Sequence, residues 1–155
     1  MEAVRPATTG DLERLSELLD EFDEATQGRR GGLIRRSTDR GRLPVSGDDA
    51  GEYLFRADRS AWAGTLDGWV AGMALCRVED GPDGLGGVLD ACFVEEEARE
   101  LGLGHLLLKS SLAWFASQGC SGVDGIAHPG DREAKQFFEG AGFTARLLVM
   151  HRSLE

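Results

Sequence analysis

Residues 95–107, EEEARELGLGHLL, place two glycines where a long helix is expected to begin. A glycine inside a helix costs roughly 0.5–1 kcal/mol relative to alanine, so Gly102 and Gly104 are unfavourable as interior residues. Strong helix formers follow them, and the apolar run GGVLDACFV (86–94), of strand length, precedes the acids. The glycines therefore mark a junction between a strand and a helix. At such a junction, backbone N–H groups and the positive end of the helix dipole face any approaching anion.

The composition is that of an ordinary globular protein with an excess of acid. The chain has 155 residues, a net charge of −10 and a pI near 4.8, and we expect a single domain over 1–155. Because nucleic acids attract basic surfaces, this charge argues against nucleic acid as a partner. An acidic surface suits a cationic substrate such as an amine, although it also simply aids solubility.

Cysteine usage and hydropathy point to the cytoplasm. The three cysteines have no C-x-x-C spacing, so the sequence indicates neither a metal site nor a disulfide framework. No apolar run approaches the roughly eighteen residues of a membrane span, and the N-terminal residues contain no apolar signal region. We therefore expect a cytoplasmic protein without a membrane segment or a metal.

Hydrophobic periodicity and turn residues predict alternating strands and helices. The clearest hairpin covers 60–80, because Asp67-Gly68 is a strong turn signal and the second arm is nearly all apolar, like a central strand. A loop is expected at 81–87. The other expected strands are 3–6, 87–94, 121–127 and 143–154, and the expected helices are 8–22, 47–58, 102–118 and 129–142. This order implies a layered α/β or α+β sheet with helices on both faces.

Three glycine motifs compete for the anion-binding junction. A P-loop needs Lys-Ser directly after its second glycine, but Lys109 and Ser110 lie one turn further into the helix. A dinucleotide fingerprint needs G-x-G-x-x-G, and GLGHLL places Leu107 where the third glycine belongs. The third motif, R-x-x-G-x-G, is matched in full by RELGLG at 99–104.

The third motif carries a family resemblance. VEEEARELGLG (94–104) resembles the loop with which GNAT N-acetyltransferases bind the pyrophosphate of acyl-coenzyme A, and AKQFFEGAGF (134–143) resembles a later helix of that family. The resemblance covers residues 3–154. It implies a mixed, mostly antiparallel sheet of about six to seven strands and transfer of an acetyl group from acetyl-CoA to a primary amine of an unidentified small molecule or protein. It also allows for a homodimer.

The resemblance further implies which residues contact acetyl-CoA. Backbone N–H groups near Phe93 and Val94 would polarise the thioester carbonyl where this strand parts from its neighbour. The loop from Arg99 to His105 would hold the phosphates, although Arg99 could instead form an ion pair with Glu95 or Glu96. The full set of expected cosubstrate-binding residues is Phe93, Val94, Arg99, Glu100, Leu101, Gly102, Leu103, Gly104, His105, Asp131 and Phe138. Asp131 is also the expected cap of its helix.

Two residues are candidates for the base that deprotonates the amine. Asp90 interrupts an apolar strand, and strand alternation places it on the same face as Cys92 and Val94. It is the first candidate as a base or water-holding group, with a hydrogen-bonded structural acid as the alternative. His128, at the end of the next strand, is the second, with a loop histidine as the alternative. His151 is expected to be structural.

One departure from the family pattern and two further features leave questions open. Phe138 stands where the family commonly has a tyrosine proposed to protonate the leaving thiolate, so a non-catalytic acyl-CoA-binding or regulatory module is the alternative to an enzyme. Cys92 could suggest an acyl-cysteine intermediate, but a packed core thiol is the simpler interpretation. The segment 28–44, with six arginines and one acid, could contact phosphate or acceptor, or be a solvated loop.

Overall fold

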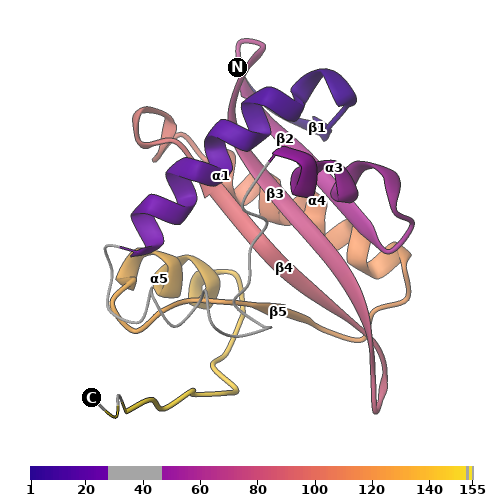
Figure 1. Cartoon of the computed structure of the whole chain (residues 1–155), viewed down its shortest axis with the longest axis vertical. Coiled ribbons are helices and arrows are strands. Elements are labelled where there is room, and N and C mark those ends of the chain that lie inside the picture. Colours follow the sequence, from indigo (N-terminus) through magenta and orange to yellow (C-terminus); the bar gives the residue numbers. More distant parts are fainter. Residues whose placement is uncertain (28–46, 153, 155) are drawn as a thin grey trace.

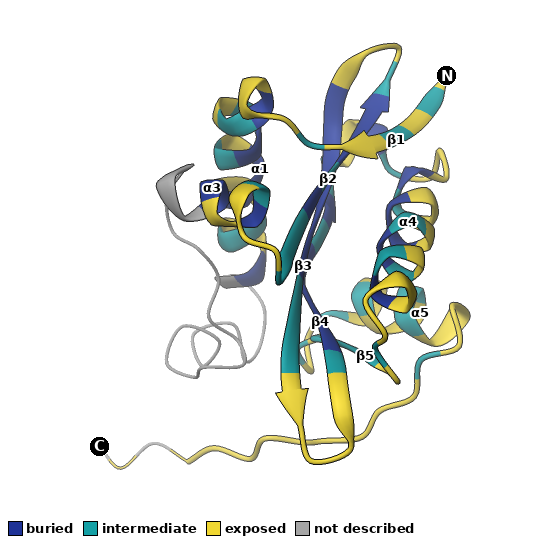
Figure 2. Cartoon of the chain, turned by 90° about the vertical axis from the view of Figure 1, so that its right-hand side faces the viewer, coloured by how far each residue is buried: buried dark blue, intermediate teal, exposed yellow. Residues whose placement is uncertain are grey.

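The computed structural model describes residues 1–27, 47–152 and 154, and these form one sheet with helices packed on both faces (Figures 1 and 2). Helices α1 and α3 cover one face, and α4 and α5 cover the other. In chain order, the elements are β1 (Glu2–Pro6), η1 (Thr9–Asp11), α1 (Leu12–Gln27), α3 (Gly47–Phe55), β2 (Arg59–Leu66), β3 (Trp69–Gly81), β4 (Gly84–Val94), η3 (Glu96–Ala98), α4 (Leu103–Ser117), β5 (Val123–Gly125) and α5 (Arg132–Gly140).

The sheet has the order β1-β2-β3-β4-β5, and every neighbouring pair is antiparallel except β4 and β5. The expected hairpin is confirmed, because β2 and β3 are joined at Asp67 (φ 49°) and Gly68 (φ 86°). Positive φ at both turn residues matches the right-handed twist of the paired strands. β3 is the central strand, as its apolar sequence predicts, and it is buried from Val70 to Cys76.

Two apolar clusters lie on the two faces of the sheet. The cluster beneath α1 and α3 includes Leu15, Leu18, Tyr53, Leu75 and Phe93. The cluster beneath α4 includes Ala74, Leu89, Leu103, Leu107 and Phe115. Side chains from successive residues of a strand point to opposite faces, so β3 and β4 supply both clusters.

Several predicted boundaries are wrong. Residues 143–152 and 154 form no strand, so the described residues contain five strands instead of six or seven. The pattern of 143–154 suits a strand, but a strand also requires a hydrogen-bonding neighbour, which this segment lacks among the described residues. The predicted loop at 81–87 is shorter, because β3 continues to Gly81 and β4 begins at Gly84. The strand expected at 121–127 covers only Val123–Gly125.

A β-bulge at Asp90 separates its direction from that of the residues that follow it in β4. Leu75 pairs with Ala91 and Cys76 pairs with Leu89, which leaves Asp90 as the extra residue of β4. The bulge interrupts the alternation of side chains. The prediction that Asp90 shares a face with Cys92 and Val94 is therefore wrong: Asp90 hydrogen-bonds to Tyr53 on the α3 face, whereas Cys92 and Val94 pack in the cluster beneath α4.

Candidate functional site

Strands β4 and β5, the last pair of the sheet, part along their length. Their parallel pairing covers three positions, from Gly87 opposite Val123 to Leu89 opposite Gly125. Beyond Leu89, β4 continues to Val94 and pairs with β3 alone among the described strands. The two strands diverge in Figure 1, and α5 lies near the open end of this gap. The backbone of β4 from Asp90 to Val94 therefore presents an edge without a strand partner among the described residues, as the resemblance predicted near Phe93 and Val94.

The N-terminus of α4 follows this edge in the chain. Gly102 is its N-cap with φ 84° and ψ 0°, a left-handed conformation that glycine adopts without steric cost. The first bond between α4 and its cap runs from the N–H of Leu106 to the carbonyl of Gly102. Helix geometry therefore leaves the N–H groups of Leu103, Gly104 and His105 outside the helical ladder, where they can bind an anion.

Glycine is not required for space at Gly102, because a Cβ there would meet nothing within 4 Å. The residue is required for its backbone angle, and Glu100 two positions earlier also has a positive φ of 69°. Leu101 is half exposed, whereas Leu103 is buried. The loop from Arg99 to Gly102 thus turns sharply and exposes Leu101 at its tip. Leu103, the first residue of α4, is buried and fixes the end of the loop to the core.

Helix α5 packs against the start of α4. The ring of Phe137 lies 5.1 Å from the ring of exposed His105, and a Cβ on Gly104 would lie 3.4 Å from Phe137. Asp131 caps α5 as predicted, since its carboxylate accepts the N–H of Ala134 at 3.1 Å. The glycine loop and the α5 cap therefore border the same region.

Arg99 binds the end of β4. Its Nε donates to the carbonyl of Val94 at 2.9 Å, its guanidinium lies 5.4 Å from the centre of the Phe93 ring, and its Nη1 is 3.9 Å from Glu133. Of the two acids expected as alternative partners, Glu95 instead accepts hydrogen bonds from Arg14 at 2.5 Å and Trp69 at 3.0 Å. Arg99 therefore ties the strand end to the glycine loop.

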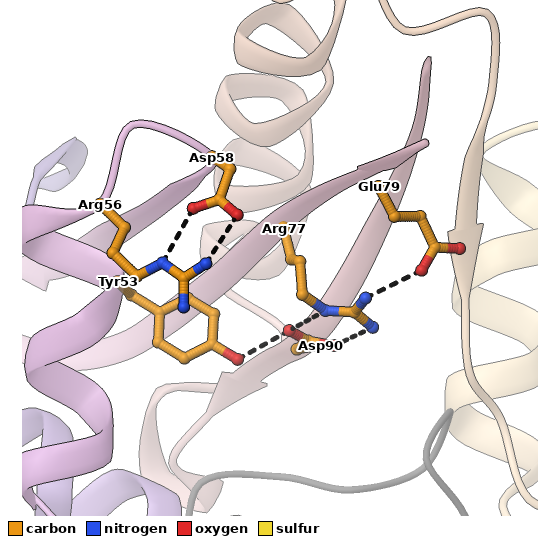
Figure 3. A network of polar contacts seen from close by, with 6 residues as sticks. All are labelled: Tyr53, Arg56, Asp58, Arg77, Glu79 and Asp90. Carbon is orange, nitrogen blue, oxygen red and sulfur yellow. Dashed lines mark hydrogen bonds and ion pairs between the residues drawn. The ribbon is translucent and has the colours of Figure 1, made fainter. Parts of the chain in front are cut away.

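Asp90 lies in a buried polar network on the α3 face (Figure 3). Its carboxylate accepts the hydroxyl of Tyr53 at 2.7 Å and two N–H groups of Arg77, at 3.1 and 3.2 Å. Arg77 also donates to Glu79 at 2.9 Å. Burial, together with the charge of Asp90, raises the pKa of the Tyr53 hydroxyl, so Tyr53 stays protonated and donates to the carboxylate.

The sequence analysis did not identify Tyr53 or Arg77 as partners of Asp90. A signal for the pair was present, because Arg77 and Asp90 each interrupt an apolar strand, and opposite charges in two such strands suggest an ion pair. Tyr53 is the single tyrosine of the chain, but it lies 37 residues from Asp90. Only the packing of α3 on the sheet brings the two together.

His128 and Phe138 lie on the β5 side of the gap. His128 follows β5 by three residues, and its carbonyl accepts the N–H of Asp131 at 2.9 Å. The ring of Phe138 covers Gly125, since a Cβ on that glycine would lie 2.4 Å from a ring carbon, and it packs 5.1 Å from the Phe143 ring. Phe138 thus contacts the sheet as expected, at the last paired residue of β5. His151 is exposed on an extended segment.

Burial disfavours the thiolate forms of Cys76 and Cys92. Burial raises the pKa of Cys76 to about 11 and that of Cys92 to about 12, because a thiolate is costly away from water. This supports the interpretation of Cys92 as a packed thiol. Among the described residues, no group of His, Cys, Asp and Glu side chains could hold a metal ion.

Two further expectations concern the arginine-rich segment and the absence of a membrane span. The arginine-rich segment 28–44 lies outside the described residues. In the part of the chain that is described, no helix has both the length and the apolar character needed to cross a membrane.

Comparison with known proteins places this geometry in context. Residues 17–143 match the family model described as the acetyltransferase (GNAT) family. A transcriptional regulator from Bacillus halodurans C-125 is 22% identical and has a TM-score of 0.72, with 98% of this chain and 100% of that chain covered. Curated protein sequences give no match.

Two aminoglycoside acetyltransferases are also similar in structure. Aminoglycoside N-acetyltransferase AAC(6')-Iy in complex with CoA is 17% identical, with a TM-score of 0.73 over 99% of this chain and 95% of that chain. An aminoglycoside acetyltransferase from an uncultured soil metagenomic sample, in complex with sisomicin, is 15% identical, with a TM-score of 0.71 and the same coverage. At these identities, the likeness shows a shared fold.

Proposed function

The chain belongs to the acetyltransferase (GNAT) family, and we propose that it transfers an acetyl group from acetyl-CoA directly to a primary amine of a small molecule or protein. The observation that carries this proposal is the gap between β4 and β5 beside the glycine-capped start of α4. The gap offers backbone N–H groups to a thioester carbonyl, and the helix N-terminus offers them to phosphate.

The glycine loop is the proposed site of the pyrophosphate. The N–H groups of Leu103, Gly104 and His105 are the donors, and Gly102 supplies the turn that exposes them. Arg99 already donates Nε to the Val94 carbonyl, so its role in this proposal is to position the loop and to add positive charge beside it. Glu100, Leu101, Asp131 and Phe138 complete the proposed cosubstrate-binding set, as neighbours of the loop or of α5.

The proposed base is His128, with Asp90 second. The Asp90 carboxylate accepts hydrogen bonds from Tyr53 and Arg77, so accepting a proton from an ammonium would disturb a buried ion pair. His128 lies where the chain leaves β5 at the gap, and an imidazole titrates near neutral pH. This order reverses the one that the sequence suggested. In this proposal Asp90 holds Tyr53 and Arg77 in position on the α3 side of the site.

The leaving thiolate has no side-chain acid at Phe138. A free thiol has a pKa of about 8.5, so departure as the thiolate instead of the thiol costs only roughly 2 kcal/mol near neutral pH, and water then protonates the thiolate. The ring of Phe138 instead fills the space over Gly125. A non-catalytic acyl-CoA-binding module would retain this packing as well. Turnover is therefore the measurement that distinguishes an enzyme from such a module.

The experiment has two stages. Isothermal titration with acetyl-CoA tests binding, and a thiol-release assay with a panel of aminoglycosides, polyamines, amino acids and peptide N-termini tests transfer. We expect saturable binding and thiol release with at least one amine, and the net charge of −10 favours a cationic acceptor. Binding without release on any amine would support the module, and absence of binding would refute both functions.

A further inference from the structure

Arg59, the first residue of β2, carries a donor that its surroundings do not satisfy. Its Nε is buried and has no hydrogen-bond partner among the described residues. The guanidinium carbon lies 5.0 Å from the centre of the Tyr53 ring, so the aromatic side chain covers one face of the cation. A contact through that face satisfies none of the N–H donors, which point outward in the plane of the guanidinium. Because buried donors are normally paired, this one points to a ligand that accepts from it.

The sheet places Arg59 directly opposite another arginine. Arg59 and Arg77 are Cα partners in the pairing of β2 with β3, so their side chains leave the same face of the sheet. Like charges in this position repel each other unless acids balance them. The acids of this network, Asp90 and Glu79, both bind Arg77, at 3.1 and 2.9 Å (Figure 3). In the described part of the chain, Arg59 forms no ion pair, so its charge has no counter-ion there.

This cation lies on the face from which an acceptor reaches the gap in the proposed function. The phosphates are proposed to lie at the start of α4, and α3 covers the opposite face of the sheet (Figure 2). Asp90 is the first residue of β4 beyond its pairing with β5, and its carboxylate accepts the Tyr53 hydroxyl at 2.7 Å. Arg59 stacks on the same tyrosine. Tyr53 therefore spans the distance between Arg59 and the start of the gap.

The surroundings of Arg59 favour a carboxylate over a phosphate. A guanidinium binds either group through parallel N–H donors. A phosphate monoester carries close to two negative charges, whereas a carboxylate carries one. Asp90 and Glu79 lie in the same network and the chain has a net charge of −10, so both repel the doubly charged group more strongly.

From this arrangement we propose that Arg59 binds a carboxylate of the acceptor, which is therefore a zwitterionic amine with its ammonium at the gap. This inference rests on the proposed transferase function and specifies the class of acceptor. β2 and β4 are two strand spacings apart, about 10 Å, so the amine and the carboxylate are separated by several bonds. An ω-amino acid or a short peptide has this form, and its ammonium suits the acidic surface.

Nuclear magnetic resonance of the arginine Nε–H groups tests binding without turnover. The signal of Arg59 is identified by its loss in Arg59→Lys. The parent chain is then titrated with 4-aminobutyrate, 5-aminovalerate and glycylglycine, each compared with its amide, and with 3-aminopropylphosphonate. We expect a saturable shift of the Arg59 signal with at least one carboxylate, and at least about tenfold weaker binding of the matching amide.

The thiol-release assay measures the same contact during transfer. Arg59→Met retains the apolar stem that packs on Tyr53 and removes the donors. It should raise KM for the carboxylate acceptor by about ten- to hundredfold, change kcat little, and leave the matching amide unaffected. The control is Arg56→Met, which makes the same change in the exposed Arg56–Asp58 pair and should leave KM unchanged. Thermal unfolding checks that each variant is folded.

The two measurements separate this inference from the proposed function. A parent chain whose Arg59 signal responds to none of these carboxylates overturns the inference, as does tighter binding of the phosphonate or a folded Arg59→Met that keeps the parent KM. Thiol release with spermidine but with no carboxylate amine would support the transferase and refute the carboxylate site. Saturable binding at Arg59 without thiol release on any amine would support the site and refute transfer.

Discussion

Replacing Asp90 by asparagine retains the shape of the side chain and removes its charge. An amide oxygen can still accept the Tyr53 hydroxyl, but it cannot neutralise Arg77, whose side chain is only 20% exposed. Removing one member of a buried ion pair costs about 3–5 kcal/mol. Arg77 keeps Glu79 as a partner at 2.9 Å, so we expect the lower end of this range, about 3 kcal/mol.

Urea and thermal unfolding measure this loss. For a chain of this length, 1 kcal/mol lowers Tm by roughly 2–4 °C, so Asp90→Asn should unfold about 6–12 °C below the parent. The control is Asp58→Asn, which makes the same chemical change in the exposed Arg56–Asp58 pair (3.0 Å). That pair should be worth less than about 1 kcal/mol.

A second variant tests whether Asp90→Asn loses stability because the charge of Arg77 is unbalanced or because the shape of the side chain has changed. Asp90→Asn/Arg77→Met removes both charges and should recover at least about half of the stability, because an apolar pair avoids the buried, unbalanced guanidinium. If Asp90→Asn unfolds at the same temperature as the parent, the network does not stabilise the fold as its geometry indicates. In the folded variant, thiol release against pH tests the base: we expect the rising alkaline limb to persist in Asp90→Asn and to disappear in His128→Gln.

The remaining predictions concern the loop, the leaving group and acid stability. Gly102→Val should weaken acetyl-CoA binding, measured by titration, at least about tenfold, because valine is strained at a φ of 84°. Gly104→Ala should have a smaller effect, because the added Cβ would lie 3.4 Å from the nearest atom of the Phe137 ring, an ordinary contact distance. Phe138→Tyr should raise thiol release by at most about thirtyfold, because roughly 2 kcal/mol is all that protonation of the leaving thiolate can recover, and a large loss would show that the ring is needed as packed. Arg5 holds the pKa of Asp11 at about 2, below its ordinary 3.8, so the pair stabilises the fold above about pH 4 and loses this effect as pH falls through 2. Asp11→Asn should therefore cost about 1–2 kcal/mol in urea unfolding at pH 7 and almost nothing at pH 2.

Local patterns predicted those parts of the fold that depend on local chemistry. The turn at Asp67-Gly68, the cap at Asp131 and the helix that begins at Leu103 all follow from a few adjacent residues, and the structure confirms them. The segment 143–154 shows the limit of this approach. Its apolar run from Leu147 to Met150 suits a strand, yet all four residues are exposed, because pairing depends on a neighbouring strand, which the sequence of the segment alone does not provide.

The site was harder to predict, because one extra residue decides where Asp90 points. Counted back from Cys92 and Val94, unbroken alternation would direct the carboxylate into the apolar cluster beneath α4, where burying an unbalanced charge is costly. With the bulge, Asp90 turns to Tyr53 and Arg77, and the chain regains its alternation before Phe93 and Val94 reach the gap. The same irregularity therefore relieves a buried charge and sets the direction of the strand edge that faces the gap. We therefore expect Asp90 to stabilise the fold around the proposed site independently of any proton transfer, and this is why its stability effect and its pH profile must be measured in the same variant.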